Sequence, residues 1–500
     1  MQIAASRMNL DPSNISAMKM VFKDGADGAG GQKVWYNSKC MDDGTETHLY
    51  QYGIVPLRLE AVVNGKEQVI WKNPTPNAPQ SLRPYCIARK EETDPDLLNI
   101  VVRDSDSAKK MIHENGFVVE FKVDGETIVM DINALIIDSM KDIKYKTKLS
   151  GLGGADCLLC STKQEQWLSV PCIANGFPIN RSANQNMQLW LALAIDGEVA
   201  KESGDFETRK GLTQMPMTIS DQRSITITHS YINGTHWFCK FLPRVMTNVK
   251  KWSLKSTSRQ AILVDYKKDV MLDKIKAVTG VTLEKLNKGG RSGTTTTGNS
   301  GRIFFSSKLV PVIQELIPES TVQEKILQLH KKMSILLRII SSDKTVDITA
   351  YKTLVSDIEQ LLAVHFSWAR LNFTLHATLQ HSAELIQEND DRGLGTLSEE
   401  ALESNNKDLR RFMETLSRKF SGELQLTDVI IRALERSNPL IQERIRSFKK
   451  PLLCTLCHST DHTSRKCPQK EDSPANASID AYDILFNSIA TDDYDSAEPE

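Results

Sequence analysis

Four side chains with metal-binding chemistry stand close together near the end of the chain. They form the motif C-x2-C-x4-H-x4-C, made of Cys454, Cys457, His462 and Cys467. Thiolates and imidazoles at this spacing match the tetrahedral coordination of zinc, and so small a unit folds only around its metal. The motif therefore predicts a CCHC zinc knuckle over residues 451–470, which presents a small face to single-stranded or distorted nucleic acid.

Two residue pairs elsewhere offer the halves of a second zinc site. Cys157 and Cys160 are spaced as C-x2-C. His376 and His381 lie five residues apart on a segment predicted to be helical, and each pair needs two more ligands to complete a tetrahedron. A pair of buried structural cysteines explains the first pair equally well. Competing ligands that lie nearer in the sequence are His229, His236 and Cys239.

A carboxylate near residue 400 lies among cations. Thr396 and, three residues on, Glu399 form the pattern of a capping box, which predicts that a helix begins here. This helix carries Glu403, and its face also holds the cations four, seven and eight residues further on, Lys407, Arg410 and Arg411. Such a face suits a phosphate backbone held through a metal ion. An ordinary solvated face with i,i+4 ion pairs is the alternative.

The elements that must position these side chains begin with a predicted sheet. Residues 19–72 predict antiparallel strands, because strand-like runs flank Asn64-Gly65, a strong hairpin signal. A strand over residues 82–90 ends in a cluster of acids, Glu91, Glu92, Asp94 and Asp96, and a helix over about residues 94–115 follows. This is the order of an RNase H-like domain, in which carboxylates from separate elements hold two Mg²⁺ ions for phosphoryl transfer.

Three segments resemble one protein family. Residues 403–412, ESNNKDLRRF, resemble the segment around the last active-site glutamate of the V(D)J recombinase catalytic subunit and its RAG-like and Transib transposase relatives. Residues 23–30, KDGADGAG, are similar to the family's first-aspartate loop. Residues 69–87 are similar to the strand, Pro-Asn turn and next strand that lead to its second acid.

The resemblance implies an active site and its cofactors. Its catalytic set is Asp27, Glu91 and Glu403, holding two Mg²⁺ or Mn²⁺ ions. Glu91 stands where the family usually has Asp, and Asp94 takes its place if the register slips by three residues. The resemblance also joins Cys157 and Cys160 to His376 and His381 as one Cys2His2 zinc site, and it places Arg302 beside DNA phosphates at the end of the predicted flexible loop 286–302.

The expected fold class is α+β. An RNase H-like catalytic domain with a mixed sheet is interrupted by a large, mainly helical, zinc-stabilised insertion, and a CCHC knuckle and a disordered tail follow. The expected boundaries are 1–150 for the catalytic core with the first two acids, 151–265 for the Cys-x2-Cys half of the insertion, 266–402 for its helical half, 403–450 for the part with the third acid, 451–470 for the knuckle and 471–500 for the acidic tail.

Composition limits the class of protein. The chain has 500 residues and a net charge of −1, but residues 471–500 hold nine acids and no Lys or Arg, so residues 1–470 carry +8. A basic body suits a nucleic-acid partner. No apolar run reaches the roughly 20 residues that cross a bilayer, and no signal-like segment follows Met1. We expect a soluble intracellular protein whose nine cysteines are reduced thiols and metal ligands.

Two functions follow as hypotheses. The first is a RAG-like DNA transposase or recombinase catalytic subunit, without the family's upstream region that binds terminal repeats. It nicks DNA and transfers strands, forming hairpins, at such repeats. The resemblance implies a nuclear homodimer with DNA and a kelch-type regulatory subunit as partners, and no membrane. The second is a zinc-dependent nucleic-acid-binding protein that descends from such an enzyme and no longer cuts. Two departures from the family favour it, Glu91 and residues 263–267, LVDYK, which stand where the family usually has His-Cys-Asp-Ile-Gly.

Overall fold

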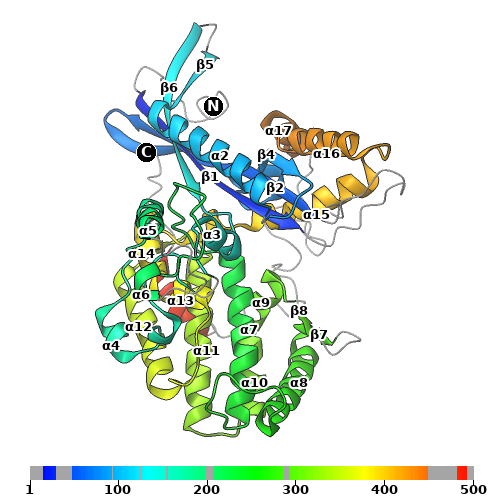
Figure 1. Ribbon diagram of the computed structural model, residues 1–500. Coiled ribbons are helices and arrows are strands. Elements are labelled where there is room, and N and C mark those ends of the chain that lie inside the picture. Colours follow the sequence, from blue (N-terminus) through cyan, green and yellow to red (C-terminus); the bar gives the residue numbers. More distant parts are fainter. Residues whose placement is uncertain are drawn as a thin grey trace, which may run out of the picture.

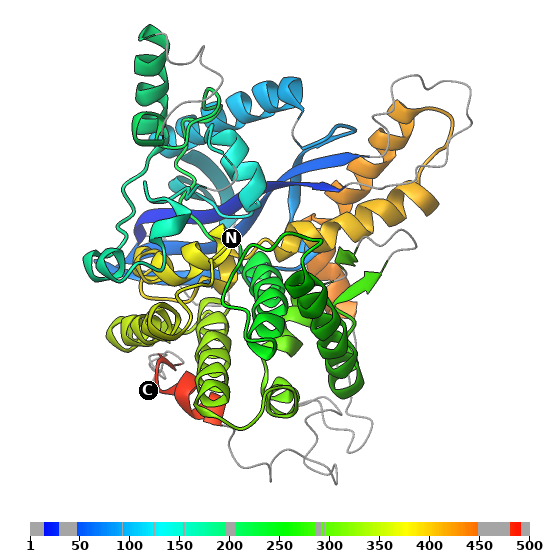
Figure 2. The same ribbon diagram turned by 60° about the horizontal axis from the view of Figure 1, so that its bottom comes forward.

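The computed structural model describes residues 15–29, 48–92, 94–123, 126–153, 156–196, 206–286, 292–294, 296–448 and 481–491. These residues form a β-sheet with helices on its faces, next to a larger body made of helices (Figures 1 and 2). The fold is therefore of the mixed α+β type, as the sequence predicts. Within the described ranges, no helix combines the length and the apolar character needed to cross a membrane.

Six strands form the main sheet. They are β1 (Ile15–Ala29), β2 (Leu49–Val63), β3 (Lys66–Lys72), β4 (Arg83–Ala88), β5 (Phe117–Val123) and β6 (Glu126–Asp138). β1, β2 and β3 are antiparallel neighbours, and β4 pairs with the first part of β2. β6 lies on the other side of β1 and runs parallel to it, with β5 antiparallel at the edge. The predicted hairpin at Asn64 and Gly65 is present, with φ of 52° and 79°.

Side chains that alternate along β2 explain why both faces of the sheet are covered. The covering helices are α2 (Pro95–Asn115), α15 (Glu400–Thr415) and α16 (Gly422–Arg436). Leu49 and Tyr50 are neighbours in the strand, so they point to opposite faces. Tyr50 packs against Leu98 of α2, whereas Leu49 packs with Leu409 of α15 and Val429 of α16. α15 therefore lies on the sheet, although most of the chain separates it from β1.

The helical body surrounds α11 (Thr321–Ile340). Its other helices are α4 (Val170–Asn175), α5 (Ala183–Ile195), α6 (Phe206–Arg209), α7 (Ile227–Met246), α8 (Arg259–Thr279), α9 (Gly298–Phe304), α10 (Val310–Leu316), α12 (Ile348–His365), α13 (Phe373–Gln380) and α14 (Ser382–Glu388). α3 (Ile143–Leu149) packs with the sheet and α2, and α17 (Pro439–Phe448) follows α16. α11 contributes Leu329, Met333 and Leu336 to one large core, which also takes in Phe238 and Phe241 of α7.

Two segments differ from the sequence predictions. The predicted flexible loop 286–302 contains the start of α9, which begins after Thr297 because that side chain accepts a hydrogen bond from the Ser300 amide. The tail predicted to be disordered contains α18 (Ala481–Asn487) and β10 (Ala490–Thr491), and β10 pairs with β9 (Thr345–Val346). This tail segment is ordered because it buries Phe486 and Ile489.

Candidate metal-dependent active site

Hydrogen bonds from β1 and β2 fix the position of α15 on the sheet. Gln51 of β2 donates to the Leu402 carbonyl at 3.0 Å and accepts from Asn405 Nδ2 at 2.6 Å. Asn406 Nδ2 donates to Asp27 Oδ2 of β1. Since Glu403 lies on the same turn as these partners, its carboxylate is held next to Asp27, and the charge of Asp27 contributes to the raised pKa of Glu403. Two of the predicted acids are thus brought together.

The start of α15 is built differently from the predicted capping box. The helix begins at Glu400, and its N-cap residue, Glu399, makes no side-chain bond to its own helix. The Glu399 carboxylate instead accepts hydrogen bonds from the amides of Ile227 and His229, at 3.0 and 3.2 Å. These are unpaired donors of the first turn of α7, which has no side-chain cap of its own. Glu399 therefore joins α15 to α7.

His229 stands between two carboxylates. Its Nδ1 lies 3.2 Å from Glu399 Oε1 and 3.7 Å from Glu403 Oε1. Burial lowers the pKa of His229, but the hydrogen bond to Glu399 and the charges of both glutamates outweigh it and raise the pKa to about 9. The imidazole is therefore protonated at neutral pH. Sequence reasoning considered His229 only as a zinc ligand, and no spacing signal linked it to Glu403.

The loop after β6 brings a further aspartate to the site. β6 is parallel to β1, so both strands end at the same edge of the sheet. The chain stays close to β1 after β6 because the Met140 amide donates to the Asp24 carbonyl at 3.0 Å. Asp142 then caps α3, accepting from the Tyr145 amide at 2.6 Å. Its charge contributes to the raised pKa of both Asp27 and His229, so Asp142 belongs to the charged groups of this site.

Glu92 also faces this site. A Cβ atom added to Gly28 would lie 2.9 Å from Glu92 Oε2, so the carboxylate lies against the end of β1. Its other oxygen pairs with Lys144 Nζ of α3 at 3.1 Å. The charge of Glu92 contributes to the raised pKa of Asp27 after that of Asp142.

The structure differs from the sequence prediction at Glu91. Its side chain is 61% exposed and lies 3.5 Å from His48 Nε2. The alternative, Asp94, caps α2 by accepting from the Leu97 amide and pairs with Lys90. The segment after β4 does reach the site, but through Glu92, which lies against the end of β1, whereas the Glu91 side chain faces His48. Because β6 is the direct parallel neighbour of β1, the acid that follows it, Asp142, is the third candidate carboxylate beside Asp27 and Glu403, and sequence analysis missed it.

The electrostatics of the site suit a bound cation. Burial, followed by the charges of Asp142 and Glu92, raises the pKa of Asp27 to about 7, against the effect of the Asn406 hydrogen bond. Burial and the charge of Glu399 raise the pKa of Glu403 to about 7. Carboxylates crowded in this way repel one another, and a divalent cation relieves the repulsion. Their hard oxygen atoms are the ligands that Mg²⁺ prefers.

A second cluster lies in the helical body and contains the predicted Cys2His2 set. Cys157 Sγ is 3.4 Å from His381 Nε2, and Cys160 Sγ is 3.3 Å from His376 Nε2. Tetrahedral zinc separates sulfur and nitrogen ligands by about 3.6 Å. All four side chains are buried, and their ligand atoms lie within 4.8 Å of one another. The arrangement therefore fits a structural zinc ion.

Local structure orients the ligands of this cluster. His376 lies in α13 and its ring stacks on Trp167 at 4.1 Å, while His381 ends the helix. Hydrogen bonds from Cys157 and the histidines lower the pKa of Cys160 to about 2, and burial lowers the pKa of His376 to about 4. A thiolate beside a neutral imidazole is the state that zinc binds. The competing set is not assembled, because His229 lies at the carboxylates.

The predicted DNA contacts fall into two groups. Lys407, Arg410 and Arg411 are exposed on α15. Arg302 instead pairs with Glu400 of α15, and its guanidinium lies 5.1 Å from the centre of the Tyr231 ring. The knuckle residues Cys454, Cys457, His462 and Cys467 lie outside the described residues.

One comparison with known proteins identifies a domain. Residues 20–156 match the family model of the RNase H domain of recombination-activation protein 1 (RAG1). The match covers the six strands apart from the start of β1, together with Asp27 and Asp142, and ends just before Cys157. It supports a relationship to the RAG-like recombinases and transposases and an RNase H-like sheet. Comparison with curated proteins finds no match.

Proposed function

We propose that this protein is a metal-dependent DNA nuclease of the RAG-like recombinase and transposase type, with Asp27, Asp142 and Glu403 as its catalytic carboxylates. The observation that carries the proposal is their origin in three separate elements. Asp27 ends β1, Asp142 follows the parallel neighbour β6, and Glu403 comes from a helix hydrogen-bonded to both β1 and β2. Each element is held independently, so the site is preorganised before DNA arrives.

These residues have distinct roles in the proposed reaction. Asp27, Asp142 and Glu403 would hold two Mg²⁺ or Mn²⁺ ions, which activate the attacking hydroxyl and stabilise the leaving oxygen of an in-line phosphoryl transfer. Protonated His229 offers a positive hydrogen-bond donor to a phosphate oxygen, because its Nε2 is free of the Glu399 bond made through Nδ1. Glu399 fixes the ring orientation, and Glu92 extends the acidic wall of the site.

DNA would approach along α15. Lys407, Arg410 and Arg411 lie on the exposed side of the helix that carries Glu403, so phosphates bound there lead to the carboxylates. In this proposal water attacks first, and the freed 3′-hydroxyl then attacks a second phosphate to form a hairpin. The two zinc sites would stabilise the helical body and bind distorted or single-stranded ends. A homodimer, a kelch-type subunit and a nuclear location stay predictions.

The alternative of a non-cutting binding protein loses its main support. That alternative depended on a glutamate at position 91 in place of the family's aspartate and on the departure at residues 263–267. In this proposal the second acid is Asp142, which follows the parallel neighbour of β1 and whose charge contributes to the raised pKa of Asp27, so the departure at Glu91 does not affect the proposed metal ligands. We therefore retain the enzyme as the proposed function.

The decisive experiment compares two acids in one assay. A pre-nicked duplex is incubated with Mn²⁺ and the protein, and hairpin and nicked products are counted on a denaturing gel. Asp142→Asn should abolish product, as should Asp27→Asn and Glu403→Gln, with rate losses of about 10³-fold or more because a metal ligand acts directly at the transition state. Glu91→Gln, a matched loss of one carboxylate, should retain activity. Loss in Glu91→Gln with activity in Asp142→Asn would overturn the assignment.

A further inference from the structure

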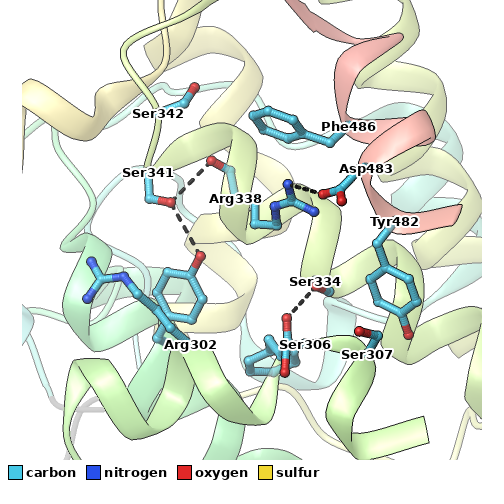
Figure 3. A pocket seen from close by; sticks show the side chains of 12 residues that line it. Arg302, Ser306, Ser307, Ser334, Arg338, Ser341, Ser342, Tyr482, Asp483 and Phe486 are labelled. Carbon is cyan, nitrogen blue, oxygen red and sulfur yellow. Dashed lines mark hydrogen bonds and ion pairs between the residues drawn. The ribbon is translucent and has the colours of Figure 1, made fainter. Parts of the chain in front are cut away.

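The C-terminal segment 481–491 is bound to the helical body by specific contacts. The Tyr482 hydroxyl lies 3.1 Å from His330 Nδ1, and Asp483 pairs with Arg338 at 2.7 Å. The Phe486 ring lies under the Arg338 guanidinium at 4.5 Å. Figure 3 shows Tyr482, Asp483 and Phe486 along one side of a cavity and Arg302 on the other side. The cavity has a volume of about 480 Å³. The segment is thus an integral part of the fold of the helical body.

The His330 contact has a defined direction. His330 Nε2 lies 3.0 Å from the Phe304 carbonyl, which can only accept, so Nε2 carries the hydrogen. Nδ1 is then the acceptor for the Tyr482 hydroxyl. His330 and Tyr482 are both buried, at 0% and 7% exposed. Both ring nitrogens of the buried His330 therefore make hydrogen bonds. Because the ring cannot turn without losing one of them, the bond to Tyr482 fixes the orientation of α18 on α11.

The strand that follows α18 holds a second chain segment in place. Ala490 and Thr491 pair with Val346 and Thr345 of β9, and the Asp347 amide donates to the Ile489 carbonyl at 2.8 Å. The opposite edge of β9 binds the loop before α15. The Val346 amide donates to the Asp391 carbonyl at 2.8 Å. β9 is therefore a central strand between the tail and this loop.

The loop before α15, residues 391–395, packs closely against the turn that follows α11. The Gly393 amide donates to the Lys344 carbonyl at 3.0 Å, and the Gly395 amide donates to the Ser342 carbonyl at 2.8 Å. A Cβ atom added to Gly395 would lie 2.4 Å from the Ser341 carbonyl oxygen. Only glycine permits this approach, so the loop is tightly packed on the turn that β10 supports from the other side.

The same loop leads directly into the candidate active site. Asn77 donates to the Gly395 carbonyl at 2.8 Å, and buried Lys23 of β1 donates to the Ser398 carbonyl at 2.7 Å. Glu399 follows and caps α7, and Glu403 lies one turn further on. A continuous series of backbone contacts thus runs from β10 through β9 and the Asp391–Gly395 loop to the carboxylates.

We infer that the C-terminal segment 481–491 is a positioning element, which holds the start of α15 and so sets the geometry of Glu399 and Glu403. The inference rests on the proposed function for its effect on catalysis, but the coupling itself concerns the chain alone. A segment far from the sheet in sequence would then act on the site through β9. The segment contacts the body through Tyr482, Asp483, Phe486 and Ile489. These residues affect catalysis only by positioning Glu399 and Glu403, and they do not touch the substrate.

The test uses full-length protein with matched variants. Deletion of residues 481–500 is compared with deletion of residues 492–500, and Phe486→Ala with Ile484→Ala, which removes a side chain of the same helix that is 59% exposed. The readouts are amide hydrogen exchange at Val346, Gly393 and Gly395, Tb³⁺ affinity of the carboxylate site by sensitised luminescence, and kcat and KM on pre-nicked DNA. A peptide of residues 479–493 is added in trans for rescue.

We expect the long deletion and Phe486→Ala to speed exchange at the three amides, weaken Tb³⁺ binding and lower kcat by about tenfold with little change in KM. The peptide should restore these values in the deletion, whereas the short deletion and Ile484→Ala should behave as the parent. Unchanged exchange and Tb³⁺ affinity in the long deletion would overturn the inference. Increased activity would overturn it too, in favour of a cover over the site. If the unmodified protein shows neither nuclease activity nor Tb³⁺ binding, the proposed function is contradicted. The coupling between the C-terminal segment and the loop before α15 is still tested by hydrogen exchange.

Discussion

Glu399 illustrates how a single residue sets the chemistry of its neighbours. Its carboxylate accepts from two α7 amides and from the His229 ring, so it fixes a helix end and a protonated imidazole together. The sequence places Glu399 beside a helix start but assigns its side chain to the wrong helix. A capping pattern is a local signal, and here the unpaired donors of another helix compete for the same carboxylate.

Residue chemistry was predictable where spacing suggested ligand pairs and the family resemblance implied which pairs share a metal. Cys157 and Cys160, with His376 and His381, were expected as one set, and the structure brings their ligand atoms together. Asp142 was missed because no spacing links it to Asp27. Its proximity depends on β6 lying parallel to β1, and strand order is not encoded in any short motif.

The zinc set gives a prediction at this scale. His381→Ala should lose one zinc per chain and lower the melting temperature by about 10 °C or more, because a structural site contributes folding free energy. Zinc is measured by mass spectrometry and melting by circular dichroism. The matched control is His236→Ala on α7, which should keep its zinc. Zinc loss in the control with retention in His381→Ala would contradict the ligand set.

His330 gives a pH-dependent prediction. Burial lowers its pKa to about 4, against an unfolded value of about 6.5. Between these values the unfolded chain binds a proton that the folded chain does not, so stability falls as the pH drops from about 6.5 to about 4. The loss should reach about 3 kcal/mol, measured by urea unfolding. His330→Gln should flatten this dependence, and His365→Gln, at an exposed position, should not.

At the scale of elements, the strands and helices with strong local signals were predictable. The Asn64-Gly65 hairpin and the helix that begins at Pro95 match the expectation closely. α18 and β10 were not expected, because their apolar residues are few and stand in an acidic sequence. Their order depends on partners in α11 and β9, which are more than 100 residues away.

Gln51 supports a prediction about how the sheet holds α15. Gln51→Leu removes a buried side chain that bonds to the Leu402 carbonyl and to Asn405 and Asn406. Asn405 Nδ2, which is buried, then loses its acceptor, and Asn406 Oδ1 and the Leu402 carbonyl lose a donor, so we expect a loss of about 2–3 kcal/mol in unfolding free energy. Gln68→Leu on β3 is the exposed control and should change stability by less than about 0.5 kcal/mol. If both variants lose the same unfolding free energy, the hydrogen bonds from Gln51 to α15 do not stabilise the fold more than an exposed glutamine does.

At the scale of the whole molecule, charge is divided between the body and the C-terminal region. Residues 1–470 carry the positive excess, while the last thirty residues are acidic. Part of that acidic segment is bound to Arg338 of the helical body. The net charge of −1 therefore hides a positive excess in residues 1–470, and the exposed cations of α15 are the part of it on the helix that carries Glu403.

This division predicts how DNA binding responds to salt. Each phosphate contact releases counterions, so log K should fall by about 0.9 per contact for each unit of log salt. The double variant Lys407→Ala with Arg411→Ala should therefore lower the slope by about 2, measured by fluorescence anisotropy between low and physiological salt. Lys66→Ala with Lys110→Ala removes the same charge from exposed positions on β3 and α2, and it should leave the slope near that of the parent. If both pairs lower the slope equally, binding follows net charge and α15 does not form the DNA path. If only the α15 pair lowers it, the phosphates lie along the helix that carries Glu403, as the proposed reaction requires.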